Sequence, residues 1–232
     1  MKQNIRFRGP SLLLLAIVHV LLFAANLAVV AALRHGAPYI NPFAPPEAIR
    51  AFFMQNSTAT RLGSFFLFGS AVPFGLFAVT TVSWRRFLKV RAAGDNITFF
   101  GGLTATFALI LSGLSGWMVS LPDIAASAPL AKAICFFSFL SGGVAYAVGF
   151  GLLAAGVSVT TYFTRHLPRW LVALGMIVAV AGEFSSFSLI TYPANFLIPI
   201  TRYLGLIWML LVAVNLTRNR RPEQVQQTAP AV

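Results

Sequence analysis

Long apolar runs separated by short polar segments dominate the pattern of this chain. Six runs are long enough to cross a bilayer, which takes about 20 residues of helix: residues 10–33, 62–82, 97–121, 133–161, 170–190 and 196–216. The first run follows a basic N-terminal segment, but it exceeds the roughly 7–15 residues of a signal-peptide core. The pattern therefore predicts an all-α polytopic membrane protein, a six-helix bundle in which residues 1–216 form a single domain.

The charge content agrees with this class. Only 9% of the residues are charged, whereas a soluble domain carries roughly 25%. The net charge of +12 is typical of nucleic-acid-binding proteins, but the cations stand in short clusters between apolar runs. We therefore expect membrane lipids as surroundings and no nucleic acid as partner. The polar residues 217–232 are predicted to form a disordered cytoplasmic tail.

The basic clusters also predict the orientation. With six spans, 12 of the 17 basic residues fall on one side of the membrane. They are Lys2, Arg6 and Arg8, then Arg85, Arg86, Lys89 and Arg91, then Arg165 and Arg169, and last Arg218, Arg220 and Arg221. Because loops rich in Lys and Arg stay in the cytoplasm, both termini are predicted to be cytoplasmic.

The longest connection, residues 34–60, is then extracytoplasmic. Four prolines between residues 38 and 46 favour an extended segment. Pro46 and Glu47 then suit the first turn of a short helix, with Ile49, Phe52 and Phe53 on one apolar face. This helix either lies in the membrane interface, with its aromatic side chains among the headgroups, or forms a lid over an outer cavity.

A polar site is expected inside the last two spans. Glu183 is an acid deep within an apolar run, and a carboxylate there is costly unless it is paired. It lies about 12 Å below the outer end of its helix and Arg202 about 9 Å below the same surface, at 1.5 Å per residue. The two residues are therefore predicted to form an ion pair, either structural or part of a binding site; the alternative is a Glu183 that burial keeps neutral. Arg61 and Ser186 are the other candidates for this site.

The fourth run carries three glycines at strict seven-residue spacing, Gly142, Gly149 and Gly156. Seven residues make nearly two turns, so the glycines share one helix face. Small residues on one face let a neighbouring helix approach closely, and we expect this face to be a packing groove. Stretches near residues 65–70 and 136–141 are similar. Either they belong to a weak repeat that relates the second and third spans to the fourth and fifth, or they are a coincidence in a chain rich in Phe and Ser.

Catalytic and cofactor chemistry have little support in the sequence. The string Gly113-Leu-Ser115-Gly resembles that of rhomboid proteases, but no histidine falls in the last two spans to complete a Ser–His dyad. The same positions argue against a haem held by two histidines, and the single Cys135 excludes a multi-cysteine metal site. We expect no enzymatic activity, no cofactor and no metal.

Several stretches carry a resemblance to a known family. They are Pro38-Tyr-Ile-Asn-Pro-Phe43, residues 65–75, Leu167-Pro-Arg-Trp170 and Glu183. With these, the chain resembles a bacterial family of small six-span proteins described as a domain of unknown function. The resemblance implies a bacterial inner-membrane protein, and it brings no known activity, cofactor or functional residue.

Two hypotheses of function follow. The first is a transporter or sensor of a small hydrophobic or amphipathic molecule, such as a lipid, with a site near the outer leaflet. The alternative is an accessory membrane protein that binds a protein partner or a second copy of itself, with a purely structural Glu–Arg pair.

Overall fold

The computed structural model describes residues 9–34, 36, 38–87 and 93–218. Within these ranges the chain forms helices and no strand, and six helices are long and apolar enough to cross a membrane, which confirms the predicted fold class. The chain is therefore an integral membrane protein. The six spans are α1 (Leu12–Leu33), α3 (Ser57–Phe87), α4 (Ala93–Val119), the continuous α6–η1–α7 (Ala128–Thr164), α8 with η2 (Arg169–Leu189), and η3 with α9 (Tyr192–Arg218). Most of the predicted tail and several of the orientation cations lie outside the described residues, whereas α9 runs on through Thr217 and Arg218.

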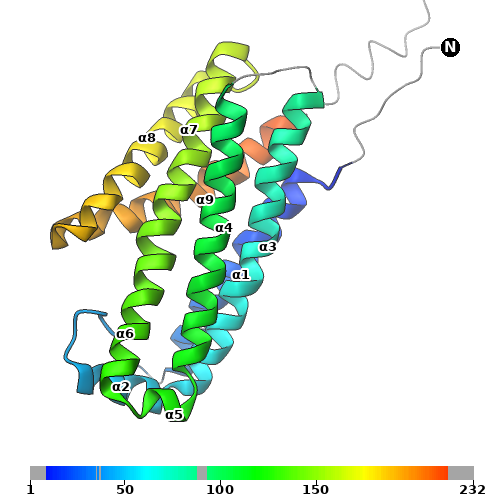
Figure 1. The fold of residues 1–232 in the computed structure, drawn as a ribbon. Coiled ribbons are helices and arrows are strands. Elements are labelled where there is room, and N and C mark those ends of the chain that lie inside the picture. The colour runs from blue at the N-terminus through cyan, green and yellow to red at the C-terminus, as the bar shows by residue number, and fades with distance from the viewer. Residues whose placement is uncertain (1–8, 35, 37, 88–92, 219–232) are drawn as a thin grey trace, which may run out of the picture.

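The bundle is built on three long antiparallel helices (Figure 1). The helix α4 lies between α3 and α6–η1–α7, while α1 packs on the other side of α3 and α8 packs on α7. The last helix, α9, contacts α8, α1 and α7. At one end lie the proline-rich segment 38–45 and two short helices, α2 (Pro46–Gln55) and α5 (Pro122–Ala125). We call this the capped end, and we call the end where α3 stops and α4 starts the opposite end.

Glycines set the distance between α4 and the fourth span. The three glycines at seven-residue spacing in that span face small residues of α4 in antiparallel order: Gly142 faces Ser112, Gly149 faces Ala105 and Gly156 faces Thr98. A Cβ atom on Gly149 would stand only 2.6 Å from the backbone nitrogen of Ala105. The facing residues on α4 are also seven apart, so two stripes of small residues interlock along the interface.

The fourth span is interrupted by a π-helical segment, η1 (Leu140–Ala145), between α6 (Ala128–Phe139) and α7 (Tyr146–Thr164). A π-helix has the wider i→i+5 hydrogen-bond register and occurs as short segments within α-helices, frequently at functional sites. Here it contains Gly142 and Gly143, whose missing side chains leave the backbone open to neighbouring helices.

The helix α2 begins at the predicted prolines, with Glu47 in its first turn. Its apolar face packs against protein: Ile49 and Phe53 are buried in a cluster with Ala131 and Ile134 of α6. Phe52 is partly buried at the edge of the same cluster. The helix therefore packs against the capped end of the bundle.

The glycine contact can be tested with a matched pair of variants. In Gly149→Ala the added methyl group would collide with the backbone of α4, and forced overpacking typically costs about 1–3 kcal/mol. In Gly69→Ala the nearest atom would be a Leu22 methyl group at 3.9 Å, an ordinary contact. Thermal unfolding in detergent micelles should show a lower midpoint for Gly149→Ala and little change for Gly69→Ala. Equal midpoints would contradict the interlocked packing.

Candidate functional site

A cavity of about 470 Å³ lies inside the bundle near the capped end. Residues of α1, α3, α4, α6, η1 and α9 line its walls, and the segment 38–45 and α2 cover it with Tyr39, Ile40 and Phe52. Most of the lining is apolar. Its lining reaches exposed residues, among them Ala31 of α1 and Tyr39, which is 71% exposed. The cavity is therefore accessible from the surface at this end.

Arg202 of α9 contributes a cation to the lining of the cavity. Its Nη2 donates to the backbone carbonyl of Gly142, within η1. The guanidinium carbon stands 5.4 Å from the ring centroid of Phe23 and 5.4 Å from that of Tyr146, in cation–π geometry. One carbonyl and two rings thus hold the side chain in place. Its Nε has no hydrogen-bond partner among the described residues.

The other polar groups of the cavity are mostly uncharged. The hydroxyls of Ser112 and Ser138 lie 3.2 Å apart, and Asn26, Ser64 and Thr60 are also among the polar residues of the lining. Arg34 lies at the end of α1 that faces the capped end. No acidic side chain among the described residues lines the cavity. The cavity is thus an apolar chamber with positive charge and neutral hydrogen-bonding groups.

The structure does not contain the predicted ion pair of Glu183 with Arg202. Glu183 is exposed on the outer face of α8, and the ion pairs of the described residues do not include it. The reason lies one residue earlier. Gly182 packs tightly on α7, where a Cβ atom would stand 2.8 Å from Cα of Gly151. Since successive helical residues point about 100° apart, this contact turns Glu183 away from the bundle.

The remaining candidates, Arg61 and Ser186, lie outside the cavity lining. Arg61 is exposed and its Nε donates to the Ser120 hydroxyl at 3.4 Å. Ser186 is also exposed, and its hydroxyl donates to the backbone carbonyl of Glu183 at 2.6 Å. Of the four residues expected to share a site, the structure places Arg202 alone in the cavity.

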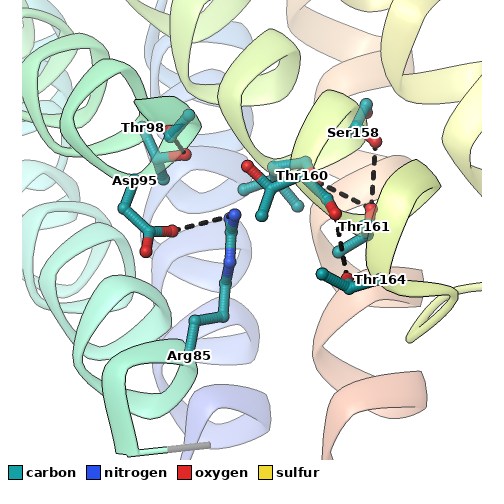
Figure 2. Close-up of polar contacts among 9 residues, drawn as sticks. Arg85, Asp95, Thr98, Ser158, Thr160, Thr161 and Thr164 are labelled. Atoms are coloured by element: carbon teal, nitrogen blue, oxygen red, sulfur yellow. Dashed lines mark hydrogen bonds and ion pairs between the residues drawn. The ribbon is translucent and has the colours of Figure 1, made fainter. Parts of the chain in front are cut away.

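Sequence reasoning missed a buried ion pair at the opposite end of the bundle. Arg85 of α3 and Asp95 of α4 approach to 2.8 Å, with side chains that are 3% and 5% exposed. Figure 2 shows the guanidinium between Asp95 and Thr160 of α7. Because Arg85 belongs to a cluster of basic residues between two apolar runs, the sequence predicts it to be a solvent-exposed loop residue. The available signal was Asp95, an acid in the first turn of α4, where the helix dipole favours negative charge.

This pair is a link between helices rather than a second ligand site. It joins the end of α3 to the start of α4 across the connection between them. Several buried polar atoms around it, including Nε and Nη1 of Arg85 and the hydroxyl of Thr160, lack a hydrogen-bond partner among the described residues. Because the pair is desolvated, loss of either partner leaves an uncompensated charge.

Comparisons with known proteins bring no relative: no family model matches the chain, and no curated protein or solved structure is significantly similar to it. Among the described residues, no group of three or more His, Cys, Asp or Glu side chains could hold a metal ion.

The importance of the missed pair can be measured by unfolding in detergent micelles. Asp95→Asn should destabilise the protein by about 3–5 kcal/mol, because the Arg85 guanidinium stays buried beside a neutral amide. The double variant Arg85→Met/Asp95→Leu removes both charges, and its loss of unfolding free energy should be much smaller. Asp123→Asn, at an exposed acid of α5, is the control and should be close to neutral. A double variant as unstable as Asp95→Asn would show that the pairing is not what matters.

Proposed function

We propose that this protein is a transporter or sensor that takes up a small amphipathic or lipid-related molecule into the cavity at its capped end. The observation that carries the proposal is the cavity, which combines a large apolar lining with a few convergent polar groups. Ligand sites in proteins have this composition, and helical bundles commonly form them between their helices. The volume of about 470 Å³ falls in the usual range of roughly 300–1,000 Å³.

We further propose that the capped end faces outward from a bacterial inner membrane. The basic clusters support this orientation. Arg165 follows the end of α7 and Arg169 starts α8, and both lie at the opposite end of the bundle, which loops rich in Lys and Arg would keep in the cytoplasm. The cavity would then open toward the outer leaflet. The short helix α2, packed over the cavity, would control entry of the ligand.

Ligand entry can be tested with two neighbouring alanines of α1. Both Ala31 and Ala32 are exposed, but only Ala31 belongs to the cavity lining. In nanodiscs, binding of tetradecanol and of tetradecanoate should be saturable. It should weaken about tenfold or more in Ala31→Trp, because the indole occupies the cavity, and stay unchanged in Ala32→Trp. If neither probe binds the parent protein, or if both variants behave alike, the cavity is not a ligand site.

A specific observation favours a second candidate function, an accessory protein that binds another membrane protein. Glu183 lies 14 residues after the start of α8, about 21 Å along the helix, which is short of the roughly 30 Å hydrocarbon layer. Its surroundings are exposed and apolar, with Val180 51%, Phe184 53% and Phe187 47% exposed. A carboxylate in such a face is stabilised by a partner helix that carries a Lys or Arg at the same depth.

This interface can be tested with a synthetic leucine–alanine transmembrane helix that carries one central lysine. Energy transfer between labelled helix and labelled protein in vesicles should report association that is lost in Glu183→Gln. A helix with leucine in place of the lysine is the matched control. Equal transfer with both helices would exclude recognition through Glu183.

A further inference from the structure

We propose that the ligand of the cavity is an amphiphile with one oxyanion head, a carboxylate or a phosphate, and that Arg202 binds this head. The inference rests on the proposed function and names its ligand class.

The first support is the charge balance of the described residues. Arg202 lies within a span, where an unpaired cation is costly. Every described acid is engaged or placed elsewhere: Glu47 pairs with Arg50 at 3.5 Å, Asp95 pairs with Arg85 at 2.8 Å, Asp123 is exposed on α5 and Glu183 is exposed on α8. The contrast with Arg85 is direct, since that guanidinium has a carboxylate beside it. The described part of the protein thus supplies Arg202 with no counter-ion, and the cavity is where one can enter.

The second support is the way Arg202 is held. The π-helical segment offers the carbonyl of Gly142 to one terminal nitrogen, and the rings of Phe23 and Tyr146 fix the guanidinium. These contacts orient the side chain without neutralising its charge. A guanidinium carries five N–H donors in a planar fork that matches the two oxygens of a carboxylate or phosphate. The hydroxyls of Ser112 and Ser138, in the same lining, each donate to the other residue's backbone carbonyl, so the guanidinium of Arg202 supplies the donors for such a head.

The third support is the shape of the cavity, which favours an oxyanion with an apolar chain over a free inorganic anion. Along α1 the lining runs from Phe23 beside Arg202 to Arg34 near the capped end. Arg34 is eleven residues after Phe23, which corresponds to about 16.5 Å along a helix. Between them the lining includes Leu27 and Val30, with Ile198 of α9. An alkyl chain would fill this length, while the partly exposed Arg34 at the outer end would attract anions toward the entrance.

The experiment compares ligands that share one chain and differ in the head. Tetradecanol, tetradecanoate and tetradecyl phosphate are titrated against the parent protein in nanodiscs, together with inorganic phosphate. We expect the two anionic amphiphiles to bind about 10- to 100-fold more tightly than the alcohol, the usual advantage of a charge-assisted hydrogen bond. The affinities of tetradecanoate and tetradecyl phosphate then show which of the two heads the cavity prefers. If inorganic phosphate binds tightly and the anionic amphiphiles do not, the ligand is not an amphiphile.

Variants of Arg202 complete the test. Arg202→Gln should remove the preference for anions and leave binding of tetradecanol unchanged, which also shows that the variant is folded. Arg202→Lys keeps the charge and should retain part of the preference. If the alcohol binds the parent as tightly as the anions, the cavity is a ligand site but the oxyanion class is wrong. If no amphiphile binds, the proposed function fails as well.

Discussion

The close contact between α4 and the fourth span is the constraint on which the rest of the structure depends. Without a hydrophobic driving force between helices in lipid, association relies on close packing, and two antiparallel stripes of small residues supply it here. The contact fixes the rotation and the height of both helices. It thereby presents the carbonyl of Gly142 to α9 on one side, and it sets the neighbours against which α3 and α8 pack.

The protein holds two guanidinium groups within its bundle by different means. Arg85 is neutralised by Asp95 and joins two helices at the opposite end. Arg202 is held by one carbonyl and two aromatic rings beside a cavity, and among the described residues it meets no carboxylate. In the first arrangement the positive charge is balanced within the protein. The second leaves a charge that a ligand can complement, and this difference separates a structural cation from a candidate binding residue.

The position of Glu183 shows that the rotation of one helix decides whether a side chain belongs to an internal site or to the outer surface. The sequence predicts Arg202 at a similar depth, but the rise per residue says nothing about the direction of a side chain. The packing of Gly182 against α7 decided the direction of the side chain instead. The carboxylate of Glu183 therefore faces the outer surface, which a partner protein could cover. Arg202 points into the cavity without this carboxylate.

By itself, the sequence determined how many helices cross the membrane and roughly where they start and end, because an apolar run of spanning length has few alternatives to a helix in lipid. It also located the glycine stripe and the proline start of α2, since both follow from local spacing and backbone geometry. Only the tertiary structure decided which side chains meet. The pairing of Arg85 with Asp95 and the contact of Arg202 with η1 depend on the rotation of each helix about its axis. A few tens of degrees of rotation exchange an inward residue for an outward one, and interhelical contacts, not the hydropathy pattern, fix that angle.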